Sequence, residues 1–138
     1  MTFLLMISYL LDSDIAIYAM SGRHPSLAKR IEQHADEVAL SAIAYAELAF
    51  GVEKSRRRQA NTRALQAFIR YLPIIPFDAD ASGHYAEIRA ELERLGTPCG
   101  ANDMLIGAHA RSLGMTLVTN NRREFDRMPG LIVENWVA

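Results

Sequence analysis

The fold class follows from one short segment, Ile7-Ser8-Tyr9-Leu10-Leu11-Asp12-Ser13-Asp14, in which a mostly apolar run ends in two aspartates. A run of this length and composition is typical of a buried strand, because large apolar side chains occupy both of its faces. Other segments share this character and are bounded by turn-forming residues. We therefore expect strands at Ile7–Asp12, Val38–Ser41, Pro73–Phe77 and Met115–Thr119, with a weaker fifth candidate at Leu131–Glu134.

Helical patterns occupy the intervals between these segments, and Pro25, Gly96 and Gly114 are typical of helix ends. Apolar strands that alternate with helices form parallel sheets covered on both faces. The sequence therefore predicts an α/β domain with a mostly parallel central sheet of four to five strands flanked by helices. Its 138 residues, half of them hydrophobic, suit one domain over residues 1–138. The expected helices are Pro25–Ala35, Ile43–Ser55, Gln59–Tyr71, Ala79–Leu95 and Asn102–Leu113.

No overall basic field indicates a nucleic-acid partner, because 15 basic and 16 acidic residues leave a formal net charge of -1. Any anionic ligand must therefore be held by local groups. The single cysteine, Cys99, excludes an internal disulfide and suits a cytoplasmic protein. The apolar opening is too short to span a bilayer and lacks the basic region of a signal peptide. Met6 could also serve as the start, which would remove Met1–Leu5.

Three acids lie in apolar surroundings. Asp12 ends the first expected strand, Glu47 lies within an apolar helical segment, and Asp103 precedes Met104-Leu105-Ile106. Carboxylates in such positions require an arginine, a donor-rich pocket or a cation. Because ligands of parallel sheets collect at the carboxyl ends of the strands, Asp12, Asp103 and the strand end at Thr119 are expected to meet at one edge.

Each acid also has a purely structural explanation. Glu47 could pair with an arginine such as Arg89, Asp103 could be a first-turn acid favoured by the helix dipole, and Asp12 or Asp14 could cap a helix. Converging carboxylates would repel one another, and a shared Mg²⁺ or Mn²⁺ ion would relieve this repulsion, since oxygen ligands favour these metals over zinc.

Several segments carry a family resemblance: Leu10–Asp14, Ser41–Gly51, Gly96–Ile106, Val118–Asn121 with Glu124-Phe125, and Pro129–Trp136. Together they resemble PIN-domain ribonucleases, and in particular VapC-type toxins of bacterial toxin-antitoxin pairs. The resemblance implies a three-layer PIN-like fold and a Mg²⁺- or Mn²⁺-dependent endoribonuclease that hydrolyses RNA. It implies that Asp12, Glu47 and Asp103 bind the metal, that Thr119 supplies a hydroxyl, and that Asn121 replaces a fourth acid found in many members. It also implies a cognate antitoxin and a homodimer.

RNA binding by a chain of this charge needs a local basic surface. The run Lys54-Ser55-Arg56-Arg57-Arg58, with Arg63 and Arg122-Arg123, supplies candidates, of which Arg56, Arg57, Arg58 and Arg122 are the most plausible RNA contacts. A solvated junction between two helices is the alternative explanation for this run.

Two other functions are compatible with parts of the sequence. Asp12 and Asp14 follow an apolar strand, as the nucleophile motif of haloacid-dehalogenase-type phosphatases does, although this reading leaves Glu47 unexplained. A non-catalytic PIN-like binding domain would retain the scaffold and use the acids structurally.

Overall fold

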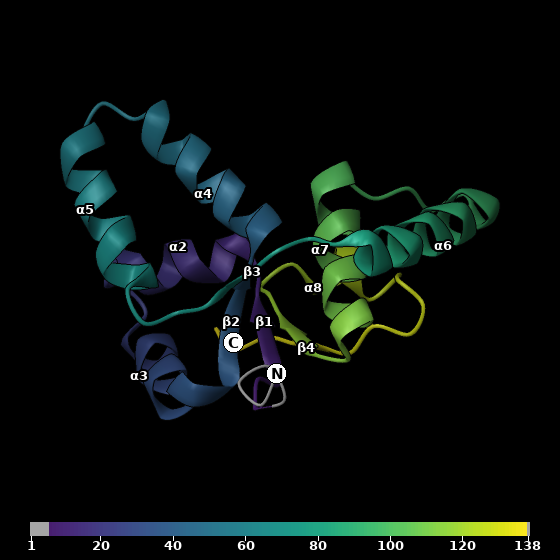
Figure 1. The fold of residues 1–138 in the computed structure, drawn as a ribbon, viewed down its shortest axis with the longest axis horizontal. Coiled ribbons are helices and arrows are strands. Elements are labelled where there is room, and N and C mark those ends of the chain that lie inside the picture. The colour runs from purple at the N-terminus through teal and green to yellow at the C-terminus, as the bar shows by residue number, and fades with distance from the viewer. Residues whose placement is uncertain (1–5, 138) are drawn as a thin grey trace.

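The computed structural model describes residues 6–137 and contains an α/β fold, as predicted (Figure 1). Within this part of the chain, five parallel strands form one sheet in the order β3-β2-β1-β4-β5. The strands are β1 (Tyr9–Leu11), β2 (Val38–Ser41), β3 (Ile74–Ile75), β4 (Thr116–Val118) and β5 (Val133–Glu134). Residues 1–5, on which the alternative start at Met6 bears, lie outside the described range.

Seven α-helices and one short 3-10 helix connect the strands of residues 6–137. They are α2 (Ser13–Ser21), α3 (Pro25–Gln33), η1 (Ala35–Glu37), α4 (Ala42–Glu53), α5 (Arg58–Ile69), α6 (Ala79–Leu95), α7 (Ala101–Leu113) and α8 (Arg122–Phe125). Figure 1 shows α2 to α5 grouped at one end of the molecule and α6 to α8 at the other. None of these helices is both long enough and apolar enough to cross a membrane.

Two helices were not expected from the sequence. Helix α2 follows directly on β1 because Asp12 caps its first turn. Its segment alternates apolar, β-branched and aromatic residues without a clear polar face, so no helical periodicity marks it. Helix α8 has four residues, too few for any periodic pattern.

The strand expected at Val38–Ser41 is confirmed as β2, whereas the other expected strands were too long. At Pro73–Phe77, for example, β3 contains Ile74 and Ile75 alone. This strand lies at one edge of the sheet and is flanked by Pro73 and Pro76, which have no N–H to donate to a neighbouring strand. The Pro73 carbonyl still accepts a hydrogen bond from the Leu40 amide at 2.8 Å, which joins this edge to β2.

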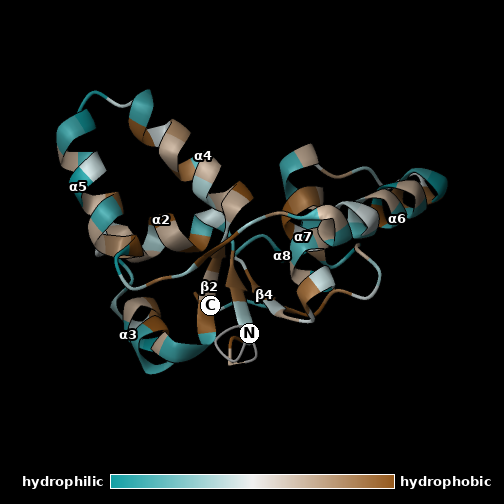
Figure 2. Ribbon diagram, in the orientation of Figure 1, coloured by the Kyte–Doolittle hydropathy of each residue, from teal (hydrophilic) through white to brown (hydrophobic). Residues whose placement is uncertain are grey.

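The core lies on both faces of the sheet. Leu10, Leu11, Leu40 and Leu117 have no exposed surface, and Ile106 of α7 is equally buried. Figure 2 shows the hydrophobic residues concentrated on the strands and the inner turns of the helices, while the outer turns of α5 and α6 are hydrophilic. Such continuous burial explains why the central strands are apolar on both faces.

Strand order reverses at β1, because β2 lies on one side of it and β4 on the other. Ligand sites of parallel sheets form where the strand order reverses, beyond the carboxyl ends of the strands. The residue that follows β1 is Asp12, and the residue that follows β4 is Thr119. The register pairs Leu11 with Val118, so the next residues, Asp12 and Thr119, emerge side by side.

Candidate active site

Asp12 is a buried carboxylate with both oxygens hydrogen-bonded. Oδ1 accepts from the Ser13 amide at 2.8 Å and so caps α2, whereas Oδ2 accepts from the Thr119 hydroxyl at 2.8 Å. The side chain is 4% exposed. Burial, followed by the nearby Asp14 carboxylate, raises the pKa of Asp12 to about 7. Asp12 therefore caps α2 and also belongs to a group of neighbouring acids.

Thr119 is fully buried and links Asp12 to the loop after β4. Its Oγ1 accepts from the Asn121 amide at 3.0 Å while donating to Asp12, and it lies 3.4 and 3.5 Å from the two carboxylate oxygens of Asp14. The Asn120 amide donates to Asp14 Oδ2 at 3.1 Å. The segment from Thr119 to Asn121 thus takes part in the site, because the Thr119 hydroxyl and the Asn120 amide bind the carboxylates of Asp12 and Asp14.

Asp14 belongs to the same site, although the sequence supported it only as a cap or a phosphatase residue. Burial raises the pKa of Asp14, and the Glu47 carboxylate raises it further, while hydrogen bonds from the Asn120 and Ile15 amides and the Thr119 hydroxyl oppose this rise. The sequence indicated a further role for one of these acids, because two acids follow β1 and a helix start needs only one cap.

Glu47 reaches the site from α4. Its Oε1 accepts from the Ser13 hydroxyl at 3.1 Å and its Oε2 accepts from the Asn102 side-chain amide at 3.3 Å. The suggested ion pair with Arg89 is absent from the described residues, because Arg89 bonds Glu93 and Tyr85 on its own helix. Glu47 is therefore held by neutral donors from α2 and α7.

Glu47 is partly exposed and lies at the edge of the buried face of α4. Phe50, three residues on, is 64% exposed, whereas Ala44 and Leu48 are the buried residues of α4. Helix α4 is apolar around most of its circumference, so spacing alone could not identify the buried side. Glu47 instead borders an apolar groove.

Asp103 lies in the first turn of α7 and is half-buried. Burial raises the pKa of Asp103 to about 6, with further contributions from the carboxylates of Glu124, Glu47 and Asp14. The Asn121 side-chain amide donates to Asp103 Oδ2 at 3.4 Å. Asp103 is thus both a first-turn acid of α7 and a member of the group of converging acids.

Glu124 was not among the predicted site residues, although its segment contributed to the family resemblance. Its Oε2 is buried and has no hydrogen-bond partner among the residues that the structure describes. An ionised oxygen in this condition is costly unless a cation or a donor reaches it. Because Glu124 also raises the pKa of Asp103, the two carboxylates face one site.

The donor set fits a hard divalent cation, since it consists of carboxylate, hydroxyl and amide oxygens. Asp12, Asp14, Glu47, Asp103 and Glu124 form an acidic cluster, and neighbouring carboxylates in it help to raise the pKa values of the three aspartates. In residues 6–137 no three His, Cys, Asp or Glu side chains already stand at metal-binding spacing. The carboxylates are instead held apart by Ser13, Asn102, Thr119 and Asn121, whose hydrogen bonds a cation would replace or complement.

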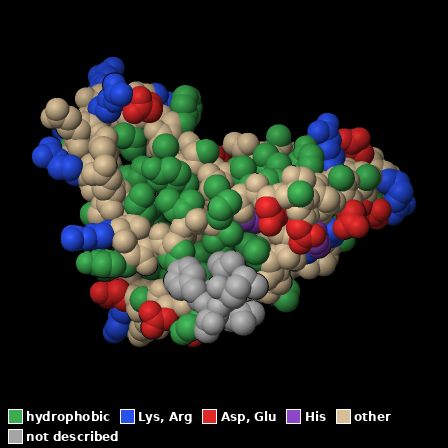
Figure 3. Space-filling model, in the orientation of Figure 1, with side chains coloured by type: hydrophobic (Ala, Val, Ile, Leu, Met, Phe, Trp, Pro, Cys, Tyr) green, Lys and Arg blue, Asp and Glu red, His purple; other side chains and the backbone are tan. Residues whose placement is uncertain are grey.

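The basic residues fall into two places. Arg56, Arg57, Arg58 and Arg63 are exposed around the junction of α4 and α5, and Arg58 pairs with Glu53 at 2.7 Å. Figure 3 shows this concentration of Lys and Arg side chains at the tip of the molecule. Arg122 instead directly follows the site residue Asn121 and pairs with Asp126 at 3.3 Å. The first group lies beyond the end of α4, about 9 Å or more along the helix from Glu47.

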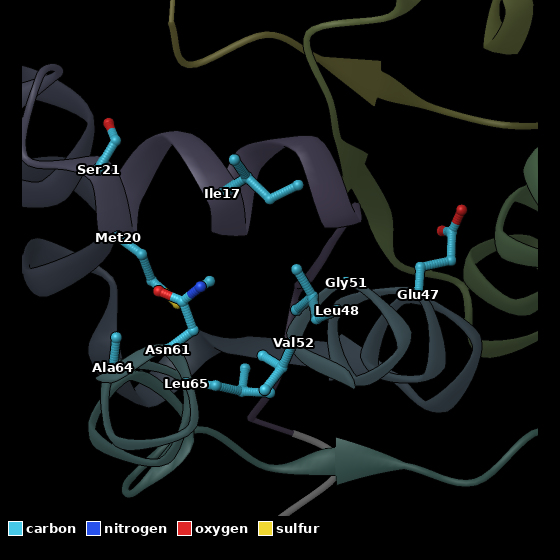
Figure 4. A pocket seen from close by; sticks show the side chains of 10 residues that line it. All are labelled: Ile17, Met20, Ser21, Glu47, Leu48, Gly51, Val52, Asn61, Ala64 and Leu65. Carbon is cyan, nitrogen blue, oxygen red and sulfur yellow. The ribbon is translucent and has the colours of Figure 1, made fainter. Parts of the chain in front are cut away.

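An apolar groove between α2, α4 and α5 runs up to the acidic cluster. Its volume is about 340 Å³, and Glu47 lies at one end of it (Figure 4). Hydrophobic side chains line the hollow on the face seen in Figure 3. The lining residues are Ile17, Met20, Ser21, Glu47, Leu48, Gly51, Val52, Asn61, Ala64 and Leu65.

Comparison with known proteins identifies the family. Residues 9–131 match the PIN domain. The chain is 43% identical over 130 residues to ribonuclease VapC2 of Rickettsia felis, covering 93% of this chain and 97% of the relative. It is 37% identical over 131 residues to the tRNA(fMet)-specific endonuclease VapC of Shigella flexneri, covering 95% and 99%.

Solved structures agree. A chain of DNA-bound VapBC from Salmonella typhimurium superposes with a TM-score of 0.92 at 37% identity, covering 95% of this chain and 99% of that chain. A chain of VapBC2 from Rickettsia felis, bound to a promoter DNA fragment, superposes with a TM-score of 0.90 at 42% identity, covering 94% and 99%. These matches reject the phosphatase and non-catalytic alternatives. The chain belongs to the PIN-domain family and, within it, to the VapC-type ribonuclease toxins of toxin-antitoxin pairs.

Proposed function

We propose that this ribonuclease hydrolyses RNA phosphodiester bonds at its acidic cluster, with Mg²⁺ or Mn²⁺ bound by Asp12, Glu47 and Asp103. The observation that carries the proposal is the convergence of these acids at the strand-order reversal, where burial and mutual repulsion raise the pKa of Asp12 to about 7 and of Asp103 to about 6. The ionised form of carboxylates in such an environment is unfavourable unless a positive charge lies nearby. The Glu124 Oε2, which has no hydrogen-bond partner within residues 6–137, supports the same conclusion.

A bound divalent cation would polarise the scissile phosphate and lower the pKa of the attacking water. The residues of this chain orient the groups around it. Thr119 and the Ser13 amide hold Asp12 in one rotamer, and Asn102 and Ser13 hold Glu47. Preformed donors of this kind spare the site the cost of reorganising during the reaction.

Asn121 and Asp14 have different roles in this proposal. Asn121 donates to Asp103 and offers a carbonyl oxygen, but it adds no negative charge where other members have an acid. Asp14, next to Thr119, has a raised pKa and is placed to accept the proton of the attacking water.

We assign transfer RNA as the substrate class, because a relative at 37% identity over nearly its whole length is a tRNA(fMet)-specific endonuclease. The exposed arginines Arg56, Arg57, Arg58 and Arg63 would contact the RNA backbone away from the scissile bond, and Arg122 would contact it next to the acids. This division is consistent with a neutral chain that concentrates its positive charge locally.

We assign the groove between α2, α4 and α5 to a cognate antitoxin, since two solved relatives are complexes of VapB with VapC. Its apolar lining fits an amphipathic segment, and Glu47 at its end fits a basic side chain of that segment. We also expect a homodimer in the cytoplasm, in line with the single cysteine and the family.

The test is cleavage of purified tRNA by antitoxin-free protein in Mg²⁺, in Mn²⁺ and in EDTA, beside Asp103→Asn. The matched control is Asp36→Asn, an exposed aspartate that precedes β2, whereas the acidic cluster lies beyond the carboxyl ends of the strands. Metal-dependent cleavage that is lost in Asp103→Asn and kept in the control supports the proposal. Cleavage that persists in EDTA refutes the metal site, and cleavage of other RNA but not tRNA refutes the substrate class.

A further inference from the structure

A buried polar contact between α4 and α7 lies outside the acidic cluster and has no role in the function described so far. His109 of α7 is 1% exposed, and its Nδ1 lies 2.9 Å from the hydroxyl of Ser41, which is completely buried. The other ring nitrogen, Nε2, lies 3.1 Å from the carbonyl oxygen of Pro76. The ring of Phe77 packs edge-on against the imidazole at 5.3 Å. His109 is therefore fixed by two different segments, the end of β2 and the residues that follow β3.

The hydrogen-bonding capacities of these groups define the tautomer. The Pro76 carbonyl can only accept, so Nε2 carries a proton and donates it. The Ser41 hydroxyl oxygen already accepts from the Ile43 amide at 3.1 Å, as the N-cap of α4. Its hydrogen therefore points to Nδ1. Burial lowers the pKa of His109, which keeps the ring neutral and Nδ1 able to accept.

This contact lies at similar distances from Glu47 and from Asn102, the hydrogen-bonded pair that joins α4 to α7 at the acidic cluster. Glu47 lies six residues after Ser41, the N-cap of α4, and Asn102 lies seven residues before His109 on α7. At 1.5 Å per residue these offsets are about 9 and 10.5 Å. The helices are thus attached at two points about the same distance apart, and sliding either helix by one residue would break both attachments.

We propose that His109 is a positioning residue for the metal-binding acids: through Ser41 it locks the register of α4 against α7 and so sets the separation of Glu47 from Asp103. This inference rests on the proposed metal site. Of the two hydrogen bonds of His109, the one to Ser41 positions Glu47, because Ser41 is the N-cap of the helix that bears Glu47. The Pro76 bond ties His109 to the segment after β3, which bears none of the acids.

Two conservative variants separate the two bonds. In His109→Asn the side-chain carbonyl oxygen stands near the Nδ1 position and keeps an acceptor for Ser41, while the Pro76 bond is lost. In His109→Gln the amide nitrogen stands near the Nε2 position and keeps the donor for Pro76, while the Ser41 bond is lost. Each variant leaves one buried group unpaired, so both lower the melting temperature by comparable amounts.

The measurement is the dissociation constant for Mn²⁺, by calorimetry on folded protein well below the melting temperature, without RNA. Loss of a supporting hydrogen bond behind a metal ligand typically weakens metal binding 10- to 100-fold. We expect about a tenfold weakening in His109→Gln and less than about a threefold change in His109→Asn. Ser41→Ala should weaken Mn²⁺ binding as much as His109→Gln does. The double variant that carries Ser41→Ala and His109→Gln should bind Mn²⁺ no more weakly than either single variant.

Equal Mn²⁺ affinities in His109→Gln and His109→Asn would overturn the positioning role and leave His109 as a stabilising residue. If His109→Gln does not fold, Ser41→Ala decides the matter: a tenfold loss supports the proposal, and unchanged affinity refutes it. Absence of Mn²⁺ binding by the wild type is a distinct result, because it refutes the metal site on which the positioning role rests.

Discussion

Asp12→Asn should stabilise the metal-free protein at alkaline pH. The substitution keeps the shape of the side chain, and its oxygen can still accept from the Ser13 amide, since Asn caps helices about as well as Asp. The amide nitrogen can donate to the Thr119 hydroxyl, which can then turn toward Asp14, 3.4 Å away. The variant therefore removes a buried charge while preserving the hydrogen-bond network.

The magnitude follows from the pKa of Asp12, which rises from 3.8 to about 7 on folding. The folded carboxyl binds its proton more tightly than the unfolded one, so this group's contribution to stability is complete below pH 4 and is lost as the pH rises through 7. A difference of about three pKa units corresponds to about 4 kcal/mol at pH 8, and to less than about 1 kcal/mol at pH 4. The side chain is 4% exposed, so solvent screens little of this effect.

The assay is thermal or urea unfolding of wild type and Asp12→Asn in EDTA at pH 4, 6 and 8. The expected advantage of the variant grows with pH and reaches about 10 °C in melting temperature at pH 8. Mg²⁺ should reverse the order by stabilising the wild type alone. The exposed Asp36→Asn serves as the control and should change little at any pH. A variant less stable than wild type at pH 8 in EDTA would refute the argument that the Asp12 charge is unfavourable.

Three further predictions follow from the same geometry. Asp103→Asn should lower tRNA cleavage roughly 100-fold or more in steady-state assays while leaving the fold intact, and activity within tenfold of wild type would contradict its role as a ligand. Thr119→Val removes the hydroxyl that bonds Asp12 and Asn121, and should cost about 1–3 kcal/mol in urea unfolding and lower the cleavage rate; unchanged values for both would count against the network. Replacement of Arg56, Arg57 and Arg58 by Gln should weaken RNA binding and reduce the slope of log affinity against log salt by about 2, without lowering the cleavage rate at saturating RNA; an unchanged slope would exclude these arginines from the interface.

The meeting of Asp12 and Thr119 at the carboxyl ends of the strands was predictable, because it depends only on where two parallel strands end. Two apolar strands, each followed by a polar residue, place Asp12 beside Thr119 once they pair in parallel, and the register of Leu11 with Val118 does this. Asp103 was predictable for a related reason, since its helix leads directly into β4. These relations survive errors of a residue or two in the strand limits.

Two of the donors that hold the acids were not predictable. Ser13 and Asn102 come from α2 and α7, and nothing in their local sequence shows that they converge on Glu47. The orientation of Glu47 depended on which side of an almost wholly apolar helix packs inward, and this is decided by α2 and α5 rather than by α4 itself. Glu124 lies on a helix too short to be recognised.

The most direct test of the account is the position of a metal ion in crystals of the protein soaked in Mn²⁺, located by its anomalous scattering. The account predicts one strong peak within coordination distance of the carboxylates of Asp12, Glu47 and Asp103, and its loss in Asp103→Asn crystals. A peak at another place, or no peak at a Mn²⁺ concentration that supports cleavage, would contradict the claim that these three acids form the catalytic metal site.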